Sequence, residues 1–181
     1  WAQWNTLVQL TLLSVVVLTG LGFYDDYAKI SQQSSGGARS YVKLGVQAAL
    51  ALFIGLYLWH MPSTRKLVTD IMVPFYKYPV MTGAGVVGLG LTILTIVGSS
   101  NAVNLTDGLD GLAVGLTLIV SFVFLVLTYL AGNKNASAYL QIPHVVGAGE
   151  LTVFCAAMIG AGLGFLWFNA WPAQVFMGDT G

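Results

Sequence analysis

The chain has 181 residues, of which 56% are hydrophobic and only 8% are charged, and its mean hydropathy is +0.79. This composition excludes an ordinary soluble domain and predicts an all-α polytopic membrane protein, in which 22 glycines allow helices to approach closely. Seven basic and seven acidic residues balance, which excludes a general attraction to nucleic acid. The single cysteine, Cys155, excludes a disulfide within these residues.

Five apolar runs are long enough to cross a bilayer, for which a helix needs roughly 17–25 residues. None shows the alternation of a membrane β-strand, so we expect five transmembrane helices. We also expect residues 1–181 to form a single transmembrane domain, an internal fragment of a longer chain, because the sequence begins at Trp1 and stops soon after Asp179. The expected helices cover residues 7–24, 44–61, 80–99, 112–131 and 151–170.

The connections between these helices carry the acidic residues unevenly. Successive crossings place three connections on one side of the membrane: residues 25–43, 100–111 and 171–181. The basic residues differ too little between the two sides to orient the protein. Five of the seven carboxylates belong to the three connections and are expected to converge on one membrane face: Asp25, Asp26, Asp107, Asp110 and Asp179.

The two opposite connections have patterns typical of structural segments. Residues 68–79 are rich in β-branched and aromatic residues, which predicts a short hairpin or an interfacial layer. Residues 137–142 predict a short surface helix that Pro143 ends. Glu150 is expected to begin the last helix, where a carboxylate suits the positive end of the helix dipole.

Asp25 and Asp26 stand together where the first expected helix ends. Lys29 follows at a spacing of three to four residues, which lets it face both carboxylates on a helix. One interpretation is a solvated helix end with a local ion pair. The other is a site for a divalent metal or for proton transfer, both of which use paired carboxylates.

The segment 101–113 is a polar stretch between two apolar runs, and polar side chains at such a place are costly to desolvate. On a helix, Asn104, Asp107 and Asp110 would share one face, and two glycines would allow a ligand to approach the backbone. A cap and turn is the alternative, although a cap needs one polar residue rather than five. The five are Asn101, Asn104, Thr106, Asp107 and Asp110.

Residues 167–181 combine aromatic side chains with a carboxylate flanked by glycines. The tryptophans are typical of a membrane-interface belt. Asp179 lies between Gly178 and Gly181, which suits a carboxylate presented to a ligand or a metal. Phe176, three residues earlier, has a ring that would stack on a planar base.

The remaining ionisable residues divide into candidate and structural positions. Lys43 begins the second expected helix on the carboxylate side, where it would meet a phosphate. His60, His144 and Cys155 are expected to be structural. The sequence has no Gly-Lys-Ser/Thr phosphate loop, no His-Glu-x-x-His zinc motif and no Gly-x-Ser-x-Gly nucleophile motif. An acidic membrane-face site with oxygen ligands remains, which fits Mg²⁺, a phosphorylated substrate and a lipid-borne partner.

Three segments carry a family resemblance: Asp-Asp-Tyr-Ala-Lys (25–29), Asn-Ala-Val-Asn-Leu-Thr-Asp-Gly-Leu-Asp-Gly-Leu-Ala (101–113) and Pro-Ala-Gln-Val-Phe-Met-Gly-Asp-Thr-Gly (172–181). They resemble the polyprenyl-phosphate sugar-1-phosphate transferases. Within that family, the Asn-Leu-Thr-Asp-Gly-Leu-Asp-Gly form and the Val-Phe-Met-Gly-Asp ending resemble the branch that transfers phospho-MurNAc-pentapeptide. The resemblance covers essentially the whole chain.

The resemblance implies a ten-helix fold, of which this chain would hold the third to seventh helices and the start of the eighth. The carboxylate face would be cytoplasmic, in the inner membrane of a bacterium. The implied reaction transfers phospho-MurNAc-pentapeptide from UDP-MurNAc-pentapeptide to undecaprenyl phosphate with Mg²⁺, which yields lipid I and UMP in peptidoglycan synthesis. The partners are therefore these two substrates and membrane lipid, and a homodimer is compatible with the resemblance.

The family's functional residues carry over to matching positions. Asp179 matches a magnesium ligand, and Asp25 and Asp26 match catalytic residues, one of them proposed to deprotonate the lipid phosphate. Lys43 matches a polar position near the cleft, and Phe176 matches a ring that stacks on uracil. The residues assigned to substrate binding are Asn101, Asn104, Asp107, Gly108, Asp110, Asn169 and Phe176.

The sequence also departs from the family pattern. Gly36 replaces a basic residue that is frequent in the loop after the acidic pair, and the family's first two helices and later His-rich loop are absent. We therefore expect these residues alone to form an incomplete site. The alternatives are a transferase for another UDP-sugar such as UDP-GlcNAc, a cation-coupled transporter, and a non-catalytic scaffold. Carboxylates at helix ends on one face favour an interfacial enzyme over the last two.

Overall fold

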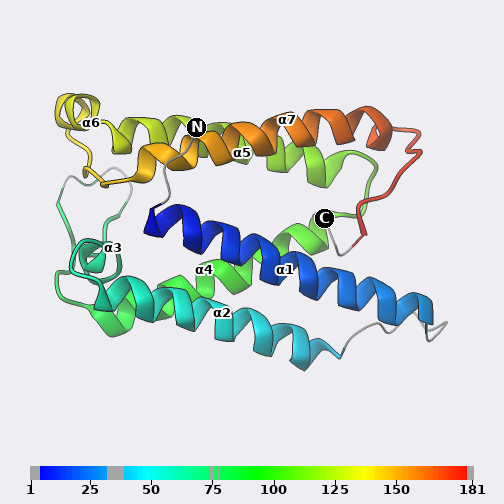
Figure 1. The fold of residues 1–181 in the computed structure, drawn as a ribbon, viewed down its shortest axis with the longest axis horizontal. Coiled ribbons are helices and arrows are strands. Elements are labelled where there is room, and N and C mark those ends of the chain that lie inside the picture. Colours follow the sequence, from blue (N-terminus) through cyan, green and yellow to red (C-terminus); the bar gives the residue numbers. More distant parts are fainter. Residues whose placement is uncertain (1–4, 32–38, 74–75, 77, 179–181) are drawn as a thin grey trace. The chain divides into compact units, whose positions relative to one another are not determined.

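The computed structural model describes residues 5–31, 39–73, 76 and 78–178 (Figure 1). These residues form helices and one isolated antiparallel bridge between Ile71 and Met81. The helices are α1 (Thr6–Ser31), α2 (Ser40–His60), α3 (Arg65–Thr69), α4 (Gly85–Thr106), α5 (Leu112–Gly132), α6 (Lys134–Leu140), the 3₁₀ turn η1 (Ala148–Glu150) and α7 (Leu151–Asn169).

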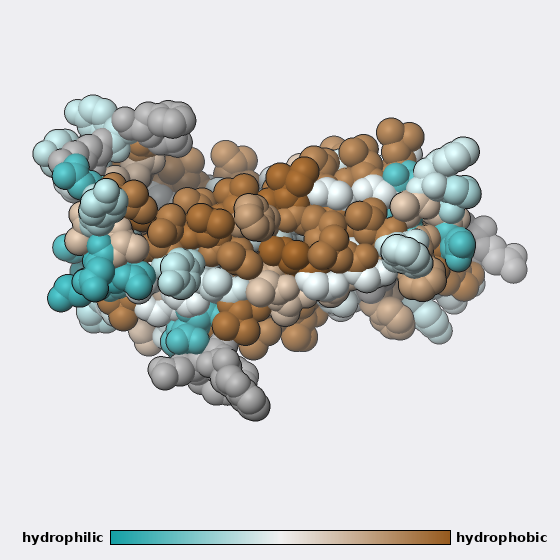
Figure 2. Space-filling view, turned by 90° about the horizontal axis from the view of Figure 1, so that it is seen from above, coloured by the Kyte–Doolittle hydropathy of each residue, from teal (hydrophilic) through white to brown (hydrophobic). Residues whose placement is uncertain are grey.

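Five helices in the described part of the chain are long and apolar enough to cross a membrane: α1, α2, α4, α5, and η1 together with α7. The predicted all-α, multi-pass membrane protein is thereby confirmed. Figure 2 shows hydrophobic side chains along the helices and hydrophilic ones gathered toward their ends. Val16, Leu94 and Leu163 are 70%, 68% and 57% exposed, as suits side chains that face lipid tails.

α1 and α2 extend beyond their predicted ranges. α1 continues to Ser31, and Lys29 stabilises the added turns because its ammonium lies one helical turn from the carboxylate of Asp25. α2 already begins at Ser40, so Lys43 lies in its first turn. The prediction that residues 25–43 connect the two helices is therefore wrong at both ends, and the acidic pair and Lys43 belong to helices.

α4 is displaced toward the C-terminus relative to the predicted range 80–99. Val80 and Met81 instead join Ile71, with Ile71 N–H donating to Met81 O and Val80 N–H donating to Ile71 O, both at 2.9 Å. These bonds form one isolated antiparallel bridge, which agrees with the hairpin alternative at Ile71 and Met81, whereas Val68 and Thr69 belong to α3 rather than to a strand. At its other end α4 continues to Thr106, and the amide of Asn101 donates to a carbonyl one turn earlier in the helix at 2.7 Å.

The opposite connection contains the predicted surface helix, displaced by a few residues. α6 begins at Lys134 because the Asn133 side chain caps it, accepting from the N–H groups of Asn135 and Ala136 at 3.0 and 3.1 Å. Glu150 stands directly before α7, as predicted.

The described residues fall into two compact units, and α1 and α4 contribute to both. Unit 1 comprises residues 5–13 and 103–178, and unit 2 comprises the described residues between Ser14 and Ala102. Whether residues 1–181 act as a single domain stays a prediction.

In unit 2, α2 and α4 lie antiparallel. Near one end the Trp59 ring lies against Gly85, leaving no room for a Cβ there, and near the other Gln47 bonds to Ser100. At Gly88 the backbone that ends α3 takes the place that a side chain would need. Glycine at these two positions thus leaves room for a neighbouring ring and for a neighbouring backbone segment.

In unit 1, α5 and α7 lie side by side and antiparallel (Figure 1). Near one end Gly132 touches the backbone of Gly149, and the hydroxyls of Thr128 and Thr152 bond at 3.1 Å. At the other end, the start of α5 meets the last residue of α7, Asn169. This pairing brings the polar turn before α5, residues 107–111, next to the segment that follows α7.

Candidate functional site

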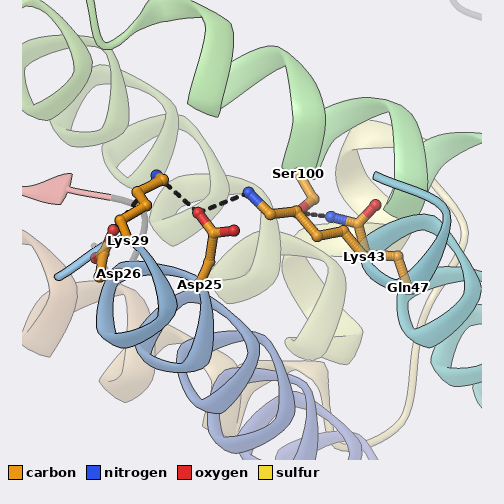
Figure 3. Close-up of polar contacts among 6 residues, drawn as sticks. All are labelled: Asp25, Asp26, Lys29, Lys43, Gln47 and Ser100. Carbon is orange, nitrogen blue, oxygen red and sulfur yellow. Dashed lines mark hydrogen bonds and ion pairs between the residues drawn. The ribbon is translucent and has the colours of Figure 1, made fainter. Parts of the chain in front are cut away.

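Four charged side chains of unit 2 form an ion-paired group, here called the lysine–aspartate cluster: Asp25, Asp26, Lys29 and Lys43. Lys29 Nζ lies 2.7 Å from Asp25 Oδ2 and 3.6 Å from Asp26 Oδ1, which confirms that Lys29 faces the acidic pair on one helix. Lys43 Nζ, from α2, lies 2.8 Å from the same Asp25 oxygen. Figure 3 shows this oxygen between the two ammonium groups.

The two carboxylates of the cluster differ in exposure. Asp25 is fully buried, and an ionised carboxylate is costly to bury without opposite charge, which the two lysines supply. The Asp26 side chain is 28% exposed and remains accessible to a ligand. The interpretation of a local ion pair is therefore correct, but the description of a solvated helix end does not fit Asp25.

A second polar link of unit 2 joins α2 to α4 next to this cluster (Figure 3). Gln47 Nε2 donates to Ser100 Oγ at 3.0 Å, and Asn101 Nδ2 donates to Gln47 Oε1 at 2.8 Å. Gln47 is 6% exposed. Asn101, predicted to bind substrate, thus bonds to a neighbouring helix. The sequence analysis missed Gln47, although an amide inside an apolar run is a signal of an interhelical contact.

Asp107 and Asp110 lie in a turn, so the prediction that they share a helix face with Asn104 is wrong. α4 ends at Thr106, and Gly111 has φ +75°, a left-handed conformation that glycine adopts without strain and that interrupts the helix before α5. The alternative of a cap and turn describes the backbone here.

Two predicted binding residues fasten the segment after α7 to this turn. Asp110 Oδ2 accepts from the N–H of Ala173 at 3.0 Å. Asn169 Oδ1 accepts from the N–H of Gly111 at 3.1 Å, and its Nδ2 donates to the carbonyl of Val175 at 2.8 Å. Asn169 is 4% exposed. Both side chains therefore bond to backbone groups of the protein itself.

The other predicted binding residues of unit 1 are exposed: Asn104, Asp107, Gly108 and Phe176. The Phe176 ring is 72% exposed, as a ring that stacks on a planar base needs to be. Asp179 and Gly36 lie outside the described residues. In unit 2 the structure thus brings Asp25, Asp26 and Lys43 together, and in unit 1 it brings Asp110 and Asn169 together around the turn.

The two histidines bond to backbone carbonyls. His60 Nδ1 lies 2.8 Å from the carbonyl oxygen of Leu56, and His144 Nδ1 lies 3.0 Å from that of Ala131. These contacts agree with the structural role predicted for both.

Among the described residues, no three His, Cys, Asp or Glu side chains gather in a group that could hold a metal ion. Asp25 already faces two ammonium groups. Asp26 and Asp107 offer accessible carboxylate oxygens, which are the donor type that Mg²⁺ prefers. The donors fit Mg²⁺ by type, and the assignment of Asp179 as its ligand stays a prediction.

The described chain has several spanning helices, an acidic pair within the last two turns of α1 and a carboxylate turn between α4 and α5. These features define a class of multi-pass membrane protein with polar sites near its helix ends. The profile of glycosyl transferase family 4 matches residues 8–181, and the chain belongs to this family.

Curated relatives match along the whole chain. The chain is 46% identical over 177 residues to the phospho-N-acetylmuramoyl-pentapeptide-transferase of Methylacidiphilum infernorum. This match covers 98% of the chain and 48% of the relative. Transferases of the same name from Citrifermentans bemidjiense and Neisseria meningitidis serogroup C are 48% identical over 182 residues and 46% identical over 183 residues. Each match covers 100% of the chain and 50% of the relative, so the chain spans about half the length of these relatives.

Proposed function

We propose that the protein containing this chain transfers phospho-MurNAc-pentapeptide from UDP-MurNAc-pentapeptide to undecaprenyl phosphate, forming lipid I and UMP in peptidoglycan synthesis. The observation that carries the proposal is the 46–48% identity to relatives named phospho-N-acetylmuramoyl-pentapeptide-transferase along essentially the whole chain. The reaction takes place at the cytoplasmic face of the bacterial inner membrane. Polar groups at helix ends support this, because a charged nucleotide substrate has to meet a lipid phosphate at the membrane surface.

The exposed residues of unit 1 are suited to the nucleotide. The Phe176 ring stacks on uracil, and Asn104 and Asp107 offer polar contacts to the nucleoside. Base–aromatic stacking contributes about 1–3 kcal/mol per base, enough to raise affinity by one to two orders of magnitude.

The lysine–aspartate cluster is suited to the phosphates. An ammonium group carries three N–H donors, so Lys43 can contact a phosphate while it remains paired with Asp25. Asp26, the more accessible carboxylate, is the better placed of the two to meet a substrate. A lipid phosphate monoester, with a second pKa of about 6, is largely ionised near pH 7, so the acceptor has little need of a base.

Mg²⁺ belongs to the proposal, with Asp179 as its ligand. When bound, the ion would neutralise charge on the diphosphate and on the leaving UMP. Loss of UMP release in EDTA and its return with MgCl₂ test the requirement for the ion.

The proposed function is tested by UMP release from the full-length protein in detergent, with undecaprenyl phosphate and Mg²⁺. UDP-MurNAc-pentapeptide and UDP-GlcNAc are compared for the wild type, Asp179→Ala and Asp70→Ala. Asp70 is the matched control, a carboxylate on the side of the membrane opposite to the proposed site.

We expect release with the pentapeptide substrate only, loss of that release in Asp179→Ala, and near-wild-type release in Asp70→Ala. Release with UDP-GlcNAc instead would assign the protein to a different transferase of the same family. If the folded protein releases no UMP with either substrate, the proposed enzymatic function is rejected and a cation-coupled transporter is favoured.

A further inference from the structure

We propose that Asp110 and Asn169 are positioning residues that act through the backbone. Together they form a clasp, defined as the hydrogen bonds of these two side chains to the segment after α7 and to the turn before α5. The clasp holds Phe176 where it can stack on the nucleotide. This last step rests on the proposed function, whereas the clasp itself does not.

The clasp joins two parts of unit 1 that are far apart in sequence. Asp110 precedes α5 and Asn169 ends α7, and the antiparallel packing of these helices places the two side chains at the same end. Asp110 holds the N–H of Ala173, and Asn169 holds the carbonyl of Val175. A further bond, from the N–H of Gln174 to a carbonyl near the end of α7 at 2.8 Å, fastens the residue between them.

Three consecutive residues are thus tied down in a segment without regular secondary structure, directly before Phe176. The side-chain oxygen and nitrogen of Asn169 both form hydrogen bonds to the backbone, and the residue is 4% exposed. Its side chain therefore has little surface to offer a substrate. Phe176 remains 72% exposed on the anchored segment. A fixed ring loses less conformational entropy when it stacks than a mobile one, so the clasp lowers the cost of nucleotide binding.

If the clasp is correct, Asp110 acts by accepting a hydrogen bond, and its negative charge is not required. Its partner is the neutral N–H of Ala173, and an asparagine carbonyl can accept the same bond. Asp110→Asn should therefore preserve the function that Asp110→Ala removes. A carboxylate that binds a metal or a cationic group would lose its function in both variants.

The experiment combines hydrogen exchange with steady-state kinetics in the full-length protein. Exchange is followed in peptides that cover residues 170–176, and KM is measured with UDP-MurNAc-pentapeptide. The variants are Asp110→Ala and Asp110→Asn, and Gln174→Ala is the matched control because it shortens an exposed side chain in the same segment.

We expect Asp110→Ala to accelerate exchange in this segment about tenfold, which corresponds to the loss of one anchoring hydrogen bond. KM should rise about tenfold while kcat changes less than about threefold, because ground-state binding is affected. Asp110→Asn and Gln174→Ala should stay within about threefold of the wild type in both readouts.

Unchanged exchange in Asp110→Ala would overturn the clasp, and so would an Asp110→Asn variant as impaired as the alanine variant. If the wild type turns over neither UDP-sugar, the proposed function fails, but hydrogen exchange still tests the clasp. If Asp110→Ala does not fold, Asn169→Asp replaces it: this variant keeps the acceptor for Gly111 and loses the donor to Val175. Faster exchange at residues 170–176 supports the clasp, and unchanged exchange rejects it.

Discussion

The two units differ in where they bury the polar side chains nearest to their candidate site residues. Unit 2 buries them between helices, where Asp25 meets lysines of two helices and Gln47 links α2 to α4. Unit 1 buries Asn169 at a helix end, where the side chain bonds to the backbone of a turn and of a loop segment. The α5–α7 pair of unit 1 has one described polar link along its length, between Thr128 and Thr152.

This difference determines what a polar substitution should disturb. In unit 2 it removes a charge or an amide that holds helices together, so both helix packing and activity depend on it. In unit 1 it releases a loop while the helices stay paired, so binding changes more than stability.

The largest effect is expected for Asp25→Asn, which leaves two ammonium groups facing a neutral amide. Breaking a buried ion pair costs roughly 3–5 kcal/mol, and we expect about 2–3 kcal/mol here because both lysines reach solvent. UMP release should fall at least about 100-fold, since Lys43 loses its position. Thermal unfolding in detergent and an activity assay measure the two effects.

Asp26→Asn is the matched control for that variant. Its carboxylate is partly exposed and lies 3.6 Å from Lys29, so we expect a stability change below about 1 kcal/mol. Equal destabilisation by the two substitutions would contradict the distinction between a buried and an accessible carboxylate.

Gly88→Ala tests the helix packing of unit 2. An added Cβ would collide with the backbone carbonyl of Val68, which cannot move aside as a side chain can, so we expect a loss of about 2–3 kcal/mol. Gly90→Ala, on the same helix, has open space around its Cβ and should be neutral or stabilising by up to about 1 kcal/mol. Similar unfolding temperatures for the two variants would show that α3 does not pack on α4 in this way.

Phe176→Ala tests whether unit 1 presents a ring to the nucleotide. KM for the UDP substrate should rise about tenfold with unchanged stability, because the ring is exposed and contributes little to packing. Trp171→Ala removes a ring that is 83% exposed in the same segment and should leave KM within about threefold. If both variants raise KM equally, exposed aromatic residues contribute in general and Phe176 has no special role.

The smallest changes in stability are expected when one interhelical hydrogen-bonded link is removed from each unit. Gln47→Leu removes two hydrogen bonds between α2 and α4 and should destabilise the protein by about 1 kcal/mol. Thr128→Val removes one bond between α5 and α7 and should cost about 0.5 kcal/mol. A larger loss for Thr128→Val, measured by unfolding in detergent, would reverse the comparison of the two units.

The sequence by itself determined the number of spanning helices, because run length and hydropathy decide whether a segment can replace water with lipid. It also determined the Lys29 pairing with Asp25 and Asp26, because helix geometry places residues three and four apart on one face. The family could be predicted as well, since its motifs are local strings of residues.

Only the tertiary structure decided the partners of residues that are distant in sequence. Lys43, on α2, forms an ion pair with Asp25 on α1, and Asp110 reaches Ala173 because α5 and α7 are antiparallel. The polar turn shows the same limit: glycine at φ +75° ends the helical pattern that the spacing of its carboxylates had indicated. The spacing of residues along the chain predicts which side chains share a face of one helix. It does not predict which side chains of different helices and loops come together in a site.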